Sequence, residues 1–354
     1  MKFNKKKGRF LEEVINRWET DGTIDSEMAA KLRGSYSHRP FDWKRMARYS
    51  FWIAILCAII SVGAAVADEA LLKMIERFFA TSYIGLCLIF AGIAVVIYFI
   101  AFLRRKRLPE KIFSNESIIF AGVLCTAVSI GYFGKAVDNG SGHFSVLFLI
   151  ATCIYALLGL WFPSTLVWIF ALVSLGSWFG TETGYRSGWG PYYHGMNYPL
   201  RFVFFGAALV ILAFIMKNIK GIRGFFRSTY VVGLLYMFIA LWILSIFGNY
   251  GDIDKWYGVR QRELFTWSIL FGVVTLSLIF YGLWADDYTA RIFGITFLFI
   301  NLYTRYFEYF WNGMHKAVFF IILAISFWLI GQQAERVWTL EFLKRDQQPE
   351  PGKK

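Results

Sequence analysis

Three polar residues share one face of a segment that is otherwise apolar and aromatic. Asn301, Arg305 and Glu308 stand at positions i, i+4 and i+7, the spacing that aligns side chains along one side of a helix. Ionisable groups inside a membrane span are costly and often line a path for a substrate. The alternative needs no substrate. Near the end of a span Arg305 can reach the interface and pair with Glu308, while Asn301 hydrogen-bonds to a neighbouring helix.

A second candidate surface lies at 181–199, where aromatic residues alternate with glycines. Its candidate binding residues are Arg186, Trp189, Tyr192, Tyr193 and His194. Such a surface can stack a sugar or a lipid headgroup, although aromatic residues at span ends also form the ordinary interfacial belt, and the belt is the favoured interpretation. A membrane enzyme that acts on lipid-linked substrates through His194 or Glu308 is a third class of function, but no nucleophile can be assigned.

No sequence pattern predicts a cofactor or a bound metal. The four cysteines lie singly in apolar runs without a Cys-x-x-Cys pair, so neither a zinc site nor a disulfide framework is indicated. His143, His194 and His315 stand in separate segments, and no two of them share a helix at ligand spacing. A Walker loop and a dinucleotide-binding fingerprint are missing. The sequence therefore favours a protein that is not an enzyme.

Composition indicates that lipid is the main solvent of this chain. Hydrophobic residues make up 57% of the 354 residues and charged residues only 17%, whereas soluble domains carry about 25% charged residues. The formal charge is +13, but Lys and Arg cluster between apolar runs, as in Arg104-Arg105-Lys106-Arg107. Such clusters orient membrane spans, and we expect no nucleic acid partner.

Long apolar runs predict an all-α polytopic membrane protein of about ten transmembrane helices. The predicted spans are 49–67, 79–103, 117–134, 144–162, 164–180, 201–216, 229–248, 263–284, 292–310 and 317–331. Pro163 interrupts the longest apolar run and predicts a hairpin there, because proline cannot continue a helix. Most Lys and Arg residues lie in the segments on the N-terminal side of the membrane, which predicts that both termini are cytoplasmic.

The N-terminal head reads as two short amphipathic helices with a break at Asp21-Gly22. A hairpin of this size is too small to fold alone, so it needs the membrane domain, a second copy of itself or a membrane-protein partner. Membrane lipids are the other expected partners. The predicted domains are a cytoplasmic head (1–48), a membrane domain (49–334) and a cytoplasmic tail (335–354). The membrane domain divides into an extra two-helix hairpin (49–112) and two four-helix units (113–226 and 227–334). The segment 69–79 has one apolar helical face, as a short interfacial helix would, but a loop that lies on the lipid headgroups is the favoured interpretation.

Matched short motifs predict that the two four-helix units are tandem repeats. Spans three to six carry Phe133-Gly134, Gly159-Leu160-Trp161 and Gly195-Met196, in that order. Spans seven to ten carry Phe247-Gly248, Gly282-Leu283-Trp284 and Gly313-Met314 at the corresponding places. Because four helices are an even number, the two copies would insert in the same orientation, related by an axis along the membrane normal.

The head and first span also carry a series of residues found in a known family. The series is Trp18, Gly22, Ile24, Glu27, Ala29-Ala30 and Leu32, followed by Phe41-Asp42-Trp43. In this arrangement the chain resembles the prokaryotic membrane proteins that share domain of unknown function 2157. The resemblance implies a bacterial inner membrane protein, and the family offers no catalytic residues to transfer.

Two classes of function follow. The absence of catalytic constellations predicts an assembly, scaffold or regulatory component of an envelope complex, which contacts its partners through the head and the aromatic loops. The alternative is a transporter or lipid-handling protein whose helices enclose a path lined by Asn301, Arg305 and Glu308.

Overall fold

The computed structural model describes residues 2–3, 14–34, 37–38, 43–67, 82–138, 140, 142–259 and 261–339. The described residues are almost entirely helical, which confirms the predicted all-α class. Two-residue strands, β1 (Lys2–Phe3) and β2 (Ser37–His38), pair in parallel. The helices are α2 (Ser26–Gly34), α3 (Trp43–Ala67), α5 (Tyr83–Arg107), α6 (Ile112–Val137), α7 (Ser145–Trp161), α8 (Thr165–Arg186), α9 (Tyr198–Met216), the 3₁₀ turn η1 (Arg223–Phe225), α10 (Phe226–Phe247), α11 (Ile253–Tyr257), α12 (Gln261–Trp284), α13 (Tyr288–Phe310) and α14 (Lys316–Thr339).

In the described part of the chain, 6 helical segments are long and apolar enough to cross a membrane, so the protein is a multi-pass membrane protein. They are α5, α6, α8, α9, η1 with α10, and α12. Each of the ten predicted spans coincides with a helix, but four of these helices are not among the six. They are α3, α7 and the apolar part of α14, of which the last two are shorter than the six, and α13, which polar residues interrupt. The count of ten therefore stays a prediction.

The described part of the head agrees with a helical hairpin. Residues 14–20 are helical, Gly22 adopts φ +67° at the break, and α2 follows. Ile15 and Ala29 are buried, whereas Trp18 is 46% exposed and Met28 is 54% exposed. The apolar stripe of the head is thus only partly covered. The segment 69–79 lies outside the described residues.

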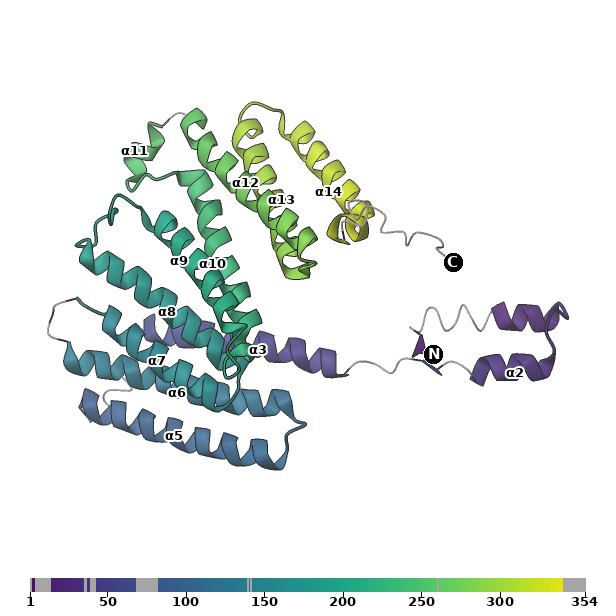
Figure 1. The fold of residues 1–354 in the computed structure, drawn as a ribbon, viewed down its shortest axis with the longest axis horizontal. Helices are drawn as coiled ribbons and strands as arrows, with labels where there is room; N and C mark the ends of the chain where they lie inside the picture. The colour runs from purple at the N-terminus through teal and green to yellow at the C-terminus, as the bar shows by residue number, and fades with distance from the viewer. Residues whose placement is uncertain are drawn as a thin grey trace, which may run out of the picture. The chain divides into compact units, whose positions relative to one another are not determined.

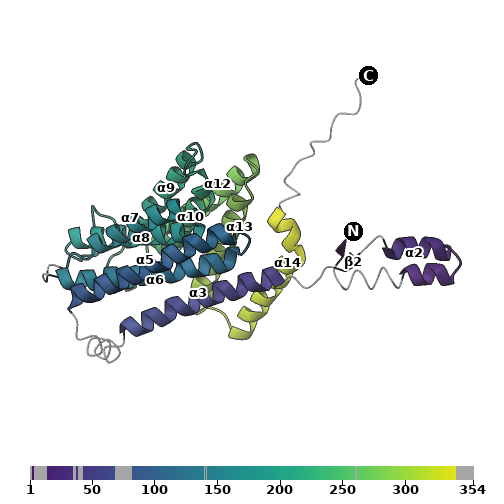
Figure 2. The ribbon, with the colours of Figure 1, turned by 90° about the horizontal axis from the view of Figure 1, so that it is seen from below.

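The chain divides into two compact units, Met1–Thr81 with Leu103–Ile118, and Ser82–Phe102 with Ile119–Lys354. The second unit consists largely of helical hairpins, in which α7 packs on α8, α9 on α10 and α12 on α13 (Figures 1 and 2). Helix α10 also contacts α8, α12 and α13, and α14 packs against α13. The hairpin predicted at Pro163 is present, because α7 ends at Trp161 and α8 begins at Thr165.

Two glycines allow α9 and α10 to cross with their backbones in contact. A Cβ atom added to Gly206 would lie 2.8 Å from the carbonyl oxygen of Gly233, and one added to Gly233 would lie 2.9 Å from the amide nitrogen of Val210. On its other side α10 packs through Phe238 against Phe297 of α13, with ring centroids 5.0 Å apart. Packing on both sides therefore fixes α10 at the centre of the second unit.

The α7–α8 and α12–α13 turns share one close contact. A Cβ atom on Gly159 would lie 3.4 Å from the amide nitrogen of Trp168, and one on Gly282 would lie 2.8 Å from that of Arg291. Both partners stand nine residues after their glycine. The two turns thus match at one of the three predicted motif pairs, and the tandem repeat stays a prediction.

Candidate functional site

Asn301 lies on α13, is 6% exposed and is bound to α12. Its Oδ1 accepts a hydrogen bond from Ser268 Oγ at 2.9 Å, and its Nδ2 donates to the Ser268 carbonyl at 3.0 Å. One residue of α12 therefore engages both ends of the amide. This arrangement joins two helices and does not direct Asn301 toward a substrate path.

Arg305 and Glu308 form an ion pair on α13 and face α10. Arg305 Nη2 donates to Glu308 Oε1 at 2.7 Å and to the Ser245 carbonyl of α10 at 2.9 Å. Their side chains are only 11% and 21% exposed. The predicted pairing is present, but the pair is largely buried against protein, and Asn301 turns to a different helix. The polar stripe is therefore divided between two helix contacts.

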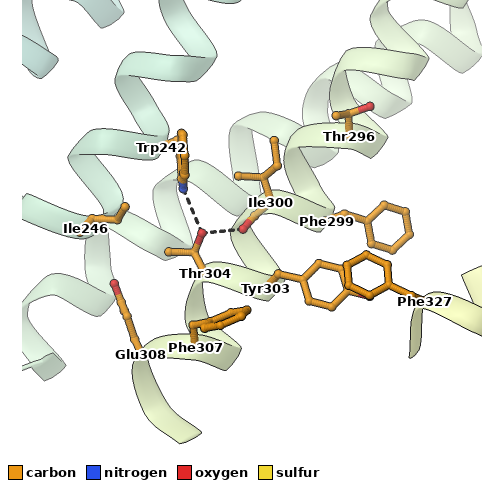
Figure 3. Close-up of a pocket in the computed structure, with 10 residues that line it drawn as sticks. All are labelled: Trp242, Ile246, Thr296, Phe299, Ile300, Tyr303, Thr304, Phe307, Glu308 and Phe327. Carbon is orange, nitrogen blue, oxygen red and sulfur yellow. Dashed lines mark hydrogen bonds between the residues drawn. The ribbon is translucent and has the colours of Figure 1, made fainter. Parts of the chain in front are cut away.

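Glu308 also lines a cavity of about 630 Å³ between α10, α13 and α14 (Figure 3). Most of the lining is aromatic or aliphatic, including Phe299, Ile300 and Phe307. Figure 3 shows Glu308 toward one side of the cavity and Phe327 toward the other. Among the described residues that line the cavity, Glu308 is the charged one.

Three of the other polar side chains of this cavity, Trp242, Tyr303 and Thr304, are engaged within the protein. Trp242 Nε1 donates to Thr304 Oγ1 at 2.9 Å, and Thr304 Oγ1 donates to the Ile300 carbonyl at 2.7 Å (Figure 3). Tyr303 stacks on Phe327 at a centroid distance of 4.7 Å, and its hydroxyl lies 3.0 Å from Ser326 Oγ. The cavity therefore presents hydrocarbon and aromatic surface to whatever fills it.

The residues predicted as a loop surface at 181–199 separate in the structure. The Tyr192 hydroxyl accepts a hydrogen bond from the Gly251 amide at 2.8 Å and donates one to the Asn249 carbonyl at 3.2 Å. Tyr192 therefore connects the α8–α9 loop to the segment between α10 and α11. Tyr193 packs over a buried arginine, and His194 is exposed with φ +49°. Trp189 is 55% exposed and lines a second cavity.

Arg186, the fifth of these residues, belongs to a polar cluster around Glu182. Glu182 accepts from Arg186 Nε at 2.6 Å and Ser145 Oγ at 2.5 Å, and lies 2.9 Å from His143 Nε2. The Ser145 hydroxyl donates to the carboxylate, which differs from a catalytic triad, where the serine hydroxyl donates to the histidine. The cluster joins the start of α7 to the end of α8.

Sequence reasoning missed Arg201, which it placed at the end of a span. Arg201 is 1% exposed, donates to the carbonyls of Met196 at 2.9 Å and Pro191 at 3.1 Å, and lies 4.4 Å from the ring centroid of Tyr198. In the described part of the chain no carboxylate forms an ion pair with it. Loop carbonyls and aromatic rings therefore solvate this cation, and it fixes the α8–α9 loop.

Asn197 and Asn249 fasten the α8–α9 loop to the segment between α10 and α11. The backbone amide of Asn197 donates to Asn249 Oδ1 at 2.9 Å, and Asn249 Nδ2 donates to the Gly195 carbonyl at 2.9 Å. Between these loops lies the second cavity, about 470 Å³. Burial and the nearby Glu263 carboxylate raise the pKa of Tyr250, whose hydroxyl donates to Glu263 Oε2 at 3.3 Å.

A metal site is not formed in the described part of the chain, where no three His, Cys, Asp or Glu residues gather at one place. In comparisons with known proteins, no family model, no curated protein and no solved structure matches this sequence.

Proposed function

We propose that this protein is a lipid-handling membrane protein that holds the apolar chain of a lipid between α10, α13 and α14. The observation that carries the proposal is the lining of the 630 Å³ cavity, where Trp242 and Thr304 bond to each other and Glu308 is paired with Arg305. A cavity lined mostly by hydrocarbon and aromatic rings binds an apolar chain by removing it from other surroundings, not by directed hydrogen bonds. A multi-pass membrane protein is surrounded by lipid, so lipid acyl chains are the apolar groups available to fill such a cavity.

The Arg305–Glu308 pair marks the polar end of this site. The pair is held to α10 through the Ser245 carbonyl, so it offers a fixed and nearly neutral dipole beside the apolar lining. A lipid whose chain enters the cavity can place its headgroup near this pair without leaving a buried charge unpaired. This role replaces the continuous polar path that Asn301 would have extended.

The proposal includes ten spans in a bacterial inner membrane with both termini in the cytoplasm. Basic residues at the end of α5 and between α9 and α10 would then lie on the cytoplasmic side, as the preference of Lys and Arg for that side predicts. The matching turns at Gly159 and Gly282 support the tandem repeat. The resemblance of the head to domain of unknown function 2157 supports the bacterial membrane.

The test is to measure which lipids stay bound to the purified full-length protein after exchange into a mild detergent. Thr296→Trp fills the cavity from α13, and Ile211→Trp places the same ring on α9, where Ile211 is 62% exposed. Native mass spectrometry should show lipid retained by the parent and by Ile211→Trp but lost from Thr296→Trp. Equal retention in all three proteins would show that the lipid is bound elsewhere and would overturn the proposal.

A second function, in the assembly of an envelope complex, is favoured by the exposed apolar side chains of the head. Trp18 and Met28 are about half exposed although the head is too small to form a core of its own. Crosslinking and co-purification from native membranes should recover a membrane-protein partner or a homo-oligomer with the parent and lose it with Trp18→Ser. Recovery of the parent chain alone would contradict this function.

A further inference from the structure

The second cavity is a cup with aromatic walls. Its described lining includes Trp189 from the α8–α9 loop, Phe247 from the end of α10, Tyr250, and Trp256 from α11. The rings of Phe247 and Trp256 lie 5.1 Å apart at an angle of 48°, which presents two differently oriented faces. A fifth aromatic ring, that of Tyr198, is already occupied by the Arg201 guanidinium, which lies 4.4 Å from its centroid. At about 470 Å³ the cup has the size of a small-molecule site.

Most polar side chains of the cup already form hydrogen bonds within the protein. Trp256 Nε1 donates to the Ile246 carbonyl at 3.1 Å, and the Tyr250 hydroxyl donates to Glu263 at 3.3 Å. Asn197 donates to the Gly248 carbonyl at 2.8 Å and accepts from the Leu200 amide at 3.1 Å. A ligand rich in hydroxyl groups, such as a sugar, would therefore find few partners here.

Asp252 is the charged residue among the described residues that line the cup, and the Arg201 guanidinium lies outside the lining, against the Tyr198 ring. Asp252 uses Oδ1 to accept the Asp254 amide at 3.0 Å. Glu263 lies next to the cup, because it accepts a hydrogen bond from Tyr250, which lines the cup. Aromatic faces together with a carboxylate attract a cation, and they do so without requiring that the cation donate hydrogen bonds.

A tight turn at the end of α8 fixes the position of Trp189. Its backbone adopts φ +59°, a left-handed conformation that bulky side chains rarely adopt, and its amide donates to the Gly184 carbonyl at 2.8 Å. Its ring also packs against Gly184, where an added Cβ would lie 3.2 Å from Trp189 Cε3. Gly188 and Trp189 are the two central residues of a turn that the Gly190 amide closes on the Ser187 carbonyl at 3.1 Å, and this turn holds the half-exposed tryptophan ring at the edge of the cup.

From these observations we infer that the cup binds a quaternary ammonium group, of the kind carried by choline. The methyl groups of such a cation contact Trp189, Phe247 and Trp256, and its charge is balanced by Asp252. This site is separate from the lipid cavity between α10, α13 and α14, so each can fail without the other.

The experiment measures equilibrium binding of radiolabelled choline to the full-length protein in a detergent without an ammonium headgroup. We expect saturable binding that tetramethylammonium displaces and that 3,3-dimethylbutan-1-ol, the neutral isostere of choline, does not. Asp252→Asn preserves an acceptor for the Asp254 amide and should weaken binding at least tenfold. Trp189→Ala should weaken it at least fivefold. The controls Asp254→Asn and Trp284→Ala should remain within twofold of the parent.

If the neutral isostere displaced choline as well as tetramethylammonium does, the cup would be an apolar pocket that does not select for charge. If hexoses displaced choline, the cup would be a sugar site. Either result overturns the inference, as does a parent that binds no choline, or an Asp252→Asn variant that melts like the parent and binds like it.

Two bilayers distinguish a phosphatidylcholine headgroup from a free solute. Nanodiscs that contain phosphatidylglycerol with either phosphatidylcholine or phosphatidylethanolamine have matched surface charge. Weaker choline binding in the phosphatidylcholine discs assigns the cup to the lipid headgroup, whereas equal binding assigns it to a soluble quaternary ammonium compound. Both results require that choline bind.

Discussion

Ser164 and Asp287 occupy the same position in two different hairpins. The backbone amide of Ser164 donates to the Gly159 carbonyl at 3.2 Å, and that of Asp287 donates to the Gly282 carbonyl at 2.9 Å. Each side chain then caps the helix that follows, Ser164 by accepting from the Val167 amide at 3.3 Å and Asp287 by accepting from the Thr289 amide at 2.9 Å. One local structure is used twice, each time five residues after a glycine of one predicted motif pair, Gly159 and Gly282.

Removing either cap should destabilise the protein by a similar amount. Ser164→Ala and Asp287→Ala each leave the first turn of a helix without its side-chain acceptor, a loss of about 1 kcal/mol. Unfolding in mixed detergent micelles measures the free energy. Ser177→Ala is the control, because Ser177 bonds only within its own helix, to the Val173 carbonyl at 3.1 Å. A loss at one cap alone would count against equivalent hairpins.

The Arg305–Glu308 pair should be more sensitive to the loss of one member than to the loss of both. Glu308→Gln leaves a largely buried guanidinium without its counter-charge, so we expect a loss between the ~1 kcal/mol of an exposed pair and the ~3 kcal/mol of a buried one. The double variant with Arg305→Gln should recover part of this loss. Melting temperature in detergent measures all three proteins. Arg186→Gln, which opens a pair whose arginine is 62% exposed, should have little effect.

Gly206→Ala should be strongly destabilising. The added methyl group would meet the backbone of α10 at Gly233 and Met237, which no side-chain rotation can relieve, and overpacking of this kind costs about 1–3 kcal/mol. Gly92→Ala in α5 is the matched control, because nothing lies within 4 Å of the added atom. Thermal unfolding of the two variants should separate them clearly; a Gly206→Ala protein as stable as the control would mean that α9 and α10 are farther apart than the structure shows.

Asn301 and Ser268 should be energetically coupled. A double-mutant cycle of Asn301→Ala and Ser268→Ala isolates their interaction, and interhelical hydrogen bonds in membranes contribute about 0.6 kcal/mol, up to about 1.7 kcal/mol. Two hydrogen bonds link this pair, so we expect the upper part of that range. Additive effects of the two substitutions would place Asn301 in a different environment.

Local chemistry explains what the sequence predicts well. Pro163 marks a hairpin because it cannot continue a helix, and each apolar run falls on a helix because backbone groups in lipid must bond internally. Helix ends are predicted less well. The span expected to end at 103 continues as α5 to Arg107, since a helix does not stop where its side chains become charged.

Long-range packing explains what the sequence does not predict. Trp242 and Thr304 are 62 positions apart and meet only once α10 and α13 pack, so the cavity between them has no local signal. Arg201 looks like an interfacial arginine in the sequence, and its burial depends on a loop that folds back over it. Asn197 does carry a local signal for the start of α9, because an asparagine two residues before a proline commonly caps the beginning of a helix.

The polar side chains of α13 have a consequence for the biogenesis of the protein. An arginine raises the free energy of insertion of a helix by about 2.5–3.5 kcal/mol at the helix centre and by less near its end, and Arg305 comes together with Asn301 and Glu308, so α13 would insert less readily alone. The partners of Asn301 and Arg305 on other helices are Ser268 of α12 and Ser245 of α10, and both are synthesised before α13. Helices α10 and α12 are therefore made before the ninth predicted span. If that span inserts next to them, its polar groups can form hydrogen bonds to these helices during insertion and need not enter the lipid unpaired.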